Sequence, residues 1–206
     1  MKFVSDRRGF VKTLFTATVL GLAYPTVLRS QIDPMHPPPP PPARADTTSM
    51  VKIVSDEEPG DRLTVSGTVF APDGRHVVSG LFVYAYNTDV RGYYAVDGKI
   101  YPPRLNGYMK TDSNGSFELH TIFPGRYPGL HVPGHVHFNL WGAGFPVQWT
   151  EDMRFEGDSY LTDEMRRESA ARGKFAMIRP LMKDKAGVYY THVNLRLLEQ
   201  SNFFER

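Results

Sequence analysis

The chain has no cysteine among its 206 residues, which excludes disulfide bonds, iron–sulfur clusters and cysteine-ligated zinc. It also has no block of one charge sign. Six of its 24 Lys and Arg and two of its 22 Asp and Glu lie in residues 1–45, which leaves 18 basic and 20 acidic side chains in the remainder. Interspersed charges in this balance do not call for a nucleic-acid partner.

The N-terminus has the pattern of an export signal. Arg7 and Arg8 precede Phe10 and Lys12, and an apolar run with few charges follows over residues 14–28. A basic segment before a short apolar segment predicts a signal peptide over residues 1–30. The paired arginines indicate export by the twin-arginine pathway. We therefore expect a periplasmic or secreted protein with no stable membrane insertion after cleavage. A single membrane anchor is the alternative, but the run is short and Pro25 interrupts it.

Residues 31–50 are expected to form a linker. Six consecutive prolines at 37–42 favour a stiff polyproline II spacer without a core. Cleavage after Ala23 or after Ala45 fits the sequence equally well, so whether the mature protein keeps the spacer stays open.

Residues 51–206 are predicted to form one all-β domain, which is long enough to bury a sizeable core. Short alternating segments are separated by turn signals such as Pro72-Asp73-Gly74, which is typical of an antiparallel β-sandwich. Thr162 can cap one short helix that ends before Gly173. The strands are expected at residues 62–71, 80–86, 107–111, 116–122, 134–141 and 187–198.

Two histidines and two tyrosines are the candidate metal ligands. His135 and His137 are two apart on an expected strand, so both side chains project from one face. Tyr127 lies between turn residues, and Tyr94 follows a glycine and Tyr93. Taken singly, each of these side chains is more typical of a core or surface position. Taken together, phenolate and imidazole suit a hard trivalent cation such as Fe(III) rather than zinc.

The order of motifs around these residues resembles the intradiol ring-cleaving dioxygenases, the catechol and protocatechuate 3,4-dioxygenase class. The motifs are Gly-x-Tyr at 92–94, Thr-Asp-x-x-Gly at 111–115, Thr-Ile-x-Pro-Gly-x-Tyr-Pro at 121–128 and Pro-x-His-x-His-Phe at 133–138. Phe-Glu-Gly-Asp at 155–158 also fits. The resemblance extends over residues 63–198.

The resemblance implies a β-sandwich that holds one non-haem Fe(III) per chain. By residue match, Tyr94 and His137 would be equatorial ligands, while Tyr127 and His135 would be axial. Tyr127 would leave the ion when a catecholate binds. The implied reaction inserts O2 into the ring of a small aromatic diol and yields a cis,cis-muconate. Tyr93 remains the alternative to Tyr94.

The chain departs from the family pattern at two places. Val132 stands where the better-known members carry an arginine that supports charge on the substrate, and we expect Arg126 or His131 to replace it in catalysis. Asp152 stands where a glutamine is usual. An acidic group there would repel an anionic substrate, which favours a neutral catechol over a carboxylated one.

Two other functions remain open. A non-enzymatic sandwich that binds a carbohydrate or surface ligand would purify without iron. An iron-binding relative that cleaves poorly, because Val132 replaces the arginine, would bind phenols without opening them. The sequence leaves the oligomeric state undecided.

Overall fold

The computed structural model describes residues 46–96 and 103–199. The predicted signal peptide (1–30) and most of the predicted linker (31–50) lie outside these ranges. Within them, no helix is both long enough and apolar enough to cross a membrane.

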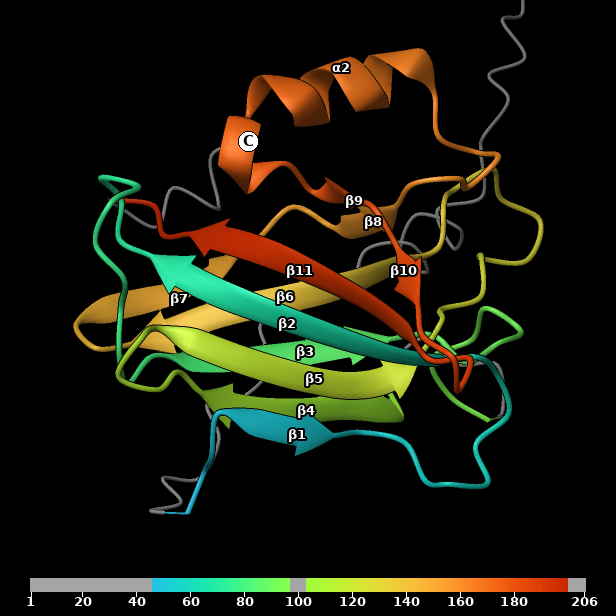
Figure 1. Cartoon of the computed structure of the whole chain (residues 1–206), viewed down its shortest axis with the longest axis horizontal. Helices are drawn as coiled ribbons and strands as arrows, with labels where there is room; N and C mark the ends of the chain where they lie inside the picture. The colour runs from blue at the N-terminus through green and yellow to red at the C-terminus, as the bar shows by residue number, and fades with distance from the viewer. Residues whose placement is uncertain (1–45, 97–102, 200–206) are drawn as a thin grey trace, which may run out of the picture. The chain divides into compact units, whose positions relative to one another are not determined.

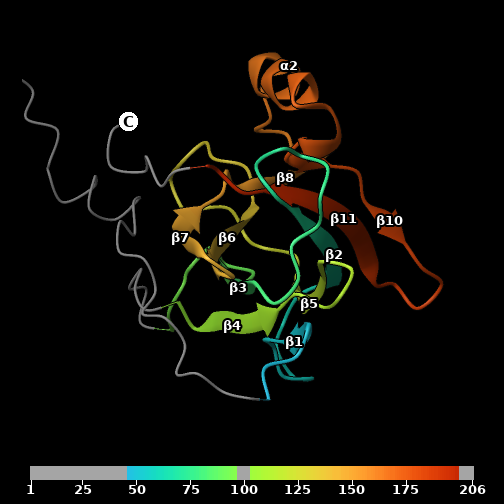
Figure 2. The same cartoon turned by 90° about the vertical axis from the view of Figure 1, so that its left-hand side faces the viewer.

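The described strands form two sheets that pack face to face, as the all-β prediction required (Figures 1 and 2). The five-stranded sheet has the order β1 (Met50–Lys52), β5 (Ser116–Ile122), β2 (Arg62–Phe70), β11 (Tyr189–Arg196) and β10 (Met182–Lys183). The six-stranded sheet has the order β4 (Leu105–Lys110), β3 (Phe82–Asn87), β6 (His135–Gly142), β8 (Met153–Phe155) and β9 (Ile178–Arg179), and β7 (Phe145–Trp149) pairs with β6. The pairs β1–β5, β2–β11 and β8–β9 are parallel, and the other pairs are antiparallel.

The core lies between the two sheets. Alternate residues of each strand face inward, as the two-residue period of a strand requires. Phe117 on β5 meets Phe138 on β6 with ring centroids 5.7 Å apart, which joins the two layers. The inward side chains of the central strands are Leu63, Val65, Val69, Val83, Ala85, Leu119, Val136, Leu140, Val193 and Leu195.

Side chains on the outer face of the six-stranded sheet are also buried. On β3, Val83 and Ala85 face the core, whereas Tyr84 and Tyr86 face outward and are still buried. Burial on both faces explains why this strand reads as a continuous apolar run rather than an alternating one. On β6 the same alternation points His135 and His137 to the outer face.

The predicted helix is α2 (Asp163–Ala171), which lies outside the two layers (Figure 2). Thr162 Oγ1 accepts a hydrogen bond from Met165 N at 3.1 Å, so Thr162 is the N-cap as expected. Gly173 follows with a positive φ of 58°, which ends the helix and begins the short 3-10 turn η1 (Gly173–Phe175).

Candidate metal centre

The structure brings four donor atoms together on the outer face of the six-stranded sheet. Tyr94 Oη lies 2.5 Å from Tyr127 Oη and 2.7 Å from His137 Nε2. His135 Nε2 lies 3.0 Å from Tyr127 Oη and 3.1 Å from His137 Nε2. The four atoms therefore close a ring. Donors that bind one ion at about 2.0–2.2 Å lie roughly 3 Å from one another, so this ring fits a single metal ion.

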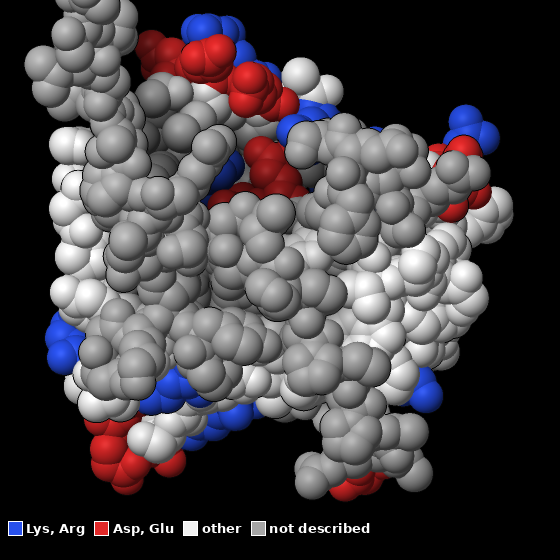
Figure 3. Space-filling view, turned by 180° about the vertical axis from the view of Figure 1, so that it is seen from behind, with Lys and Arg blue, Asp and Glu red and all other residues white. Residues whose placement is uncertain are grey.

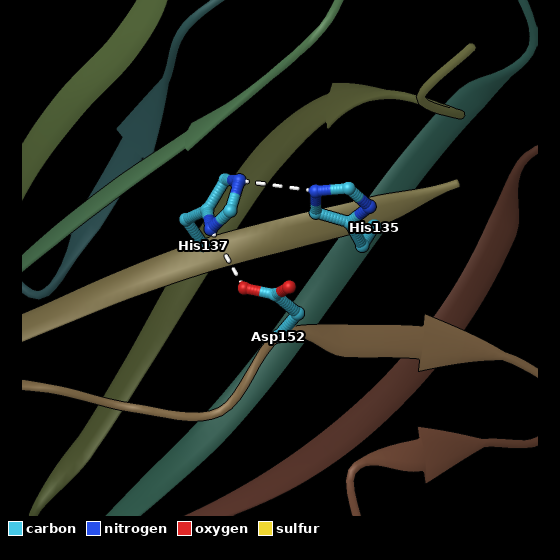
Figure 4. A group of neighbouring side chains, drawn as sticks. All are labelled: His135, His137 and Asp152. Atoms are coloured by element: carbon cyan, nitrogen blue, oxygen red, sulfur yellow. Dashed lines mark hydrogen bonds and ion pairs between the residues drawn. The ribbon is translucent and has the colours of Figure 1, made fainter. Parts of the chain in front are cut away.

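Hydrogen bonds at the far side of each imidazole aim the Nε2 atoms at the ring centre. His135 Nδ1 donates to the Pro133 carbonyl at 2.7 Å. His137 Nδ1 lies 2.8 Å from Asp152 Oδ1 (Figure 4). A proton held on Nδ1 leaves the lone pair on Nε2, which is the arrangement found in histidine metal ligands.

Asp152 is the third member of a His135, His137 and Asp152 group whose ligand-type atoms all lie within 4.8 Å of one another. Its Oδ1 contacts His137 on the side opposite Nε2, so the carboxylate orients the imidazole instead of joining the ring of donors. Burial opposes its ionisation, but His137, His135 and Arg154 together outweigh burial and hold the pKa of Asp152 well below its ordinary value. The sequence predicted an acid near the site but not this contact.

Burial sets the protonation of the metal-free site. It raises the pKa of Tyr94 well above that of an ordinary tyrosine and the pKa of Tyr127 to about 12. It lowers the pKa of His135 to about 4, with His137 as the second cause. Without a cation the phenols and His135 are therefore neutral near pH 7, and a bound cation must displace the phenolic protons.

Tyr94 reaches the site from a loop after β3. Tyr93 and Tyr94 do not lie on a strand, because this segment folds around the Asp89 carboxylate. Asp89 Oδ1 accepts from Arg91 N at 2.9 Å and from Tyr93 N at 3.1 Å. The turn leaves Tyr93 36% exposed and buries Tyr94, so Tyr94 is the tyrosine that joins the four donors.

Tyr86 is a neighbour of the site that the sequence reasoning missed. It pairs with His137 across β3 and β6, and the two rings stack with centroids 4.5 Å apart. The cross-strand register places two outward side chains side by side, and that register is not visible in either strand alone. The stack restrains the His137 ring from a second direction.

The Arg126 and His131 side chains both contact the Tyr160 ring. The Arg126 guanidinium pairs with Asp158 and stands over the Tyr160 ring at 4.5 Å. His131 is exposed and packs on the same Tyr160 ring. Among the described residues, no hydrogen bond or ion pair joins either side chain to the four donors. Val132 is half-buried and brings no charge to this place.

The described charges on the surrounding surface are mixed. On the face seen in Figure 3, acidic and basic side chains lie beside one another. The nearest acids to the site are paired: Asp152 with His137 and Arg154, and Glu151 with Arg154 and Arg172. The negative charge behind His137 is therefore partly offset.

Comparisons with known proteins agree with this architecture. A family model described as Dioxygenase matches residues 37–194. The protocatechuate 3,4-dioxygenase beta chain of Burkholderia cepacia is 35% identical over 119 residues, which are 52% of this chain and 51% of that protein. Catechol 1,2-dioxygenase 1 of Acinetobacter lwoffii is 28% identical over 161 residues, which are 69% of this chain and 50% of that protein.

Solved structures share the fold. Catechol 1,2-dioxygenase from Pseudomonas arvilla C-1 has a TM-score of 0.57 at 23% identity, over 74% of this chain and 57% of that chain. The dioxygenase domain of a dioxygenase and carbohydrate-binding protein fusion from Streptomyces sp. SirexAA-E has a TM-score of 0.56 at 24% identity, over 81% of this chain and 99% of that chain.

With the family match over most of its length, this chain belongs to the intradiol ring-cleaving dioxygenase family. The family assignment made from the motifs is thereby confirmed, and so is the β-sandwich. The chain spans about half the length of the curated relatives that it matches.

Proposed function

We propose that this protein is a non-haem Fe(III)-dependent dioxygenase that opens the ring of a catechol-type diol between its two hydroxyl-bearing carbons. The observation that carries the proposal is the closed ring of two phenol oxygens and two imidazole nitrogens. Phenolate oxygen and imidazole nitrogen together favour a hard trivalent ion. One Fe(III) per chain, held by Tyr94, Tyr127, His135 and His137, would supply a Lewis acid that binds the diol and prepares its ring for O2.

The residues around the ion have separable tasks. Tyr94 and His135 are buried, and the backbone of β6 fixes both histidines, so these groups form the rigid side of the site. Tyr127 is half-buried and lies on a loop, so it would be the ligand best able to leave the ion when a diol binds. The Tyr127 phenol oxygen could take up a proton from a substrate hydroxyl, because burial at this position favours its protonated form.

The preferred substrate is proposed to be an uncarboxylated catechol. Asp152 adds negative charge behind His137, and Val132 offers no cation to a substrate carboxylate. A higher kcat/KM for protocatechuate than for catechol would refute this preference. His131 and Arg126 remain the proposed replacements for the missing arginine, and unchanged turnover in both His131→Ala and Arg126→Ala would rule out that role.

The first experiment is a visible absorption spectrum of the purified protein with iron analysis, before and after addition of catechol under air. A phenolate-to-Fe(III) band that shifts with catechol, followed by formation of a cis,cis-muconate, is the expected result. A protein that stays colourless after incubation with Fe(III) would contradict the proposal and favour a binding module. A band that shifts without product would indicate an iron protein that binds phenols but does not cleave them.

We also propose export through the twin-arginine route, on the strength of Arg7, Arg8 and the apolar run after them. Replacing both arginines by lysine should retain the protein in the cytoplasm. Equal amounts of the changed and unchanged proteins outside the cytoplasm would contradict this route.

A further inference from the structure

Tyr127 and His135 are eight residues apart, and the chain between them forms no strand. The residues just before Tyr127 are tied to the loop that carries Tyr94, because Gly125 N donates to the Asp89 carbonyl at 3.0 Å. Thr88 Oγ1 also donates to the Gly125 carbonyl at 2.7 Å. A separate contact must hold the two ends of the loop at the spacing that puts Tyr127 Oη 3.0 Å from His135 Nε2.

Asp158 makes that contact. Its Oδ2 accepts from Gly134 N at 3.0 Å and from Arg126 Nε at 3.1 Å. Its Oδ1 accepts from Tyr160 N at 2.9 Å and lies 3.0 Å from Arg126 Nη2. The side chain is 4% exposed, so the carboxylate is a buried charge with a bidentate arginine and two backbone donors as partners.

The partners of Asp158 are the immediate neighbours of two candidate ligands. Arg126 precedes Tyr127, and Gly134 precedes His135. One carboxylate therefore links the residues that precede both ligands, through the Arg126 side chain and the Gly134 backbone. Asp158 itself follows β8, whose Arg154 pairs with His135 in the sheet, so the link starts from a fixed point.

We propose that Asp158 is a positioning residue that sets the spacing of Tyr127 and His135, and that Arg126 acts at the site through Asp158. The inference rests on the proposed function for its effect on iron. It extends that function by giving Arg126 a task that needs no contact with the substrate. A buried carboxylate that loses its arginine keeps its desolvation cost, so the pair should act as a unit.

The test compares Asp158→Asn and Arg126→Gln with the control Glu156→Gln in the full chain. Glu156 lies two residues from Asp158 and pairs with Arg166 Nε at 3.0 Å, but this pair is half exposed and touches none of the four donors. Amide hydrogen exchange at Gly134 and His135 is measured in the metal-free proteins. The phenolate-to-Fe(III) band and the rate of iron release to a chelator are measured after loading.

In both variants we expect amide exchange and iron release to be about tenfold faster and the phenolate-to-Fe(III) band to shift. In the Glu156→Gln control all three should be unchanged. Arg126→Lys should show smaller increases in exchange and iron release than Arg126→Gln, because it keeps the charge but loses the bidentate geometry. Unchanged exchange at Gly134 and His135 would overturn the proposal. Faster exchange with an unchanged band and release rate would also overturn it, because only stability would then have changed.

Two outcomes separate this inference from the proposed function. If the unmodified chain takes up no iron, the proposed function fails, and exchange in the metal-free proteins still decides the role of Asp158. If Asp158→Asn does not fold, Arg126→Gln carries the test, since it leaves Asp158 with its donors from Gly134 and Tyr160.

Discussion

Two phenols of the same chemistry occupy different environments at the candidate metal centre. Tyr94 is 3% exposed and comes from the tightly folded loop around Asp89, whereas Tyr127 is half-buried on the loop before β6. Among the described residues, the buried Tyr94 hydroxyl bonds to Tyr127 and His137 of the donor ring, whereas the loop position of Tyr127 leaves its ring freer to move. The two should therefore respond differently to loss of the hydroxyl.

We expect Tyr94→Phe to lower the iron content sharply, because a rigid ligand position is lost. Tyr127→Phe should keep much of the iron but change the absorption band and slow ring opening. Iron analysis and visible spectra measure both effects. Tyr93→Phe is the matched control on the adjacent exposed ring, and loss of iron in that variant but not in Tyr94→Phe would transfer the assignment to Tyr93.

Asp152→Asn should weaken iron binding by about 10–100-fold, because His137 would lose the negative charge that raises its basicity and holds it firmly in place. The variant should still fold, since an amide oxygen can accept the same hydrogen bond. Chelator competition measures the affinity. Asp163→Asn on the exposed first turn of α2 serves as control, and equal affinity in the Asp152 and Asp163 variants would contradict the orienting role.

Metal-free protein should lose stability as the pH falls from about 6.5 to about 4. His135 has a folded-state pKa of about 4, so only the unfolded chain binds its proton in this window. The loss from this group can reach about 3 kcal/mol. Denaturant unfolding at several pH values measures it, and His135→Gln should flatten the dependence. An equally steep dependence in that variant would assign it to other groups.

At the scale of elements, the site depends on two loops that touch through their backbones. Gly92, in the Tyr94 loop, has φ 85°, and a Cβ added there would lie 1.8 Å from the Arg126 carbonyl oxygen. This close approach brings the Tyr94 loop against the loop that carries Tyr127. The same two loops carry the phenol oxygens that lie 2.5 Å apart at the site.

Gly92→Ala should therefore reduce both stability and iron content, whereas Gly129→Ala should cost only the strain of a positive φ, about 1–2 kcal/mol. Gly129 has a similar φ of 76°, but an added Cβ there meets nothing within 4 Å. Thermal unfolding and iron analysis of both variants separate the clash from the backbone strain. Equal effects in the two would show that the loop contact is unimportant.

At the scale of the whole sandwich, the metal site and the core share β6. Phe138 packs into the core on one face, and its neighbour His137 faces the site on the other. The position of the two histidines is thus set by how the sheet packs. The mixed surface charge and the lack of cysteine leave core burial as the main source of stability.

Phe138→Ala should lower the free energy of unfolding by about 3–5 kcal/mol and weaken iron retention with it. Met182→Ala, at a side chain that is 70% exposed, should change neither. Denaturant unfolding with and without iron measures the effects. Normal iron retention in a destabilised Phe138→Ala variant would show that the site holds its geometry independently of the core.

The sequence predicted the elements that have strong local patterns. The strand at Ser116–Ile122 and the helix capped by Thr162 lie where alternation and capping placed them. The strands β1 and β8 were missed because three residues are too few to show an alternating pattern. The strand β7 was missed because the glycines at 142 and 144, in the turn before it, interrupt the pattern. β8 matters most for the site, since Asp152 directly precedes it and Asp158 follows it.

The sequence by itself determined the donor chemistry and the common face of His135 and His137, because a strand repeats every two residues. The motif order also determined the family. Only the tertiary structure decided that Tyr94 joins the donors and Tyr93 does not, that Asp152 holds His137, and that Arg126 binds Asp158. Each of these contacts joins segments that are far apart along the chain or depends on the conformation of a loop. Such packing leaves no periodic signal in the sequence.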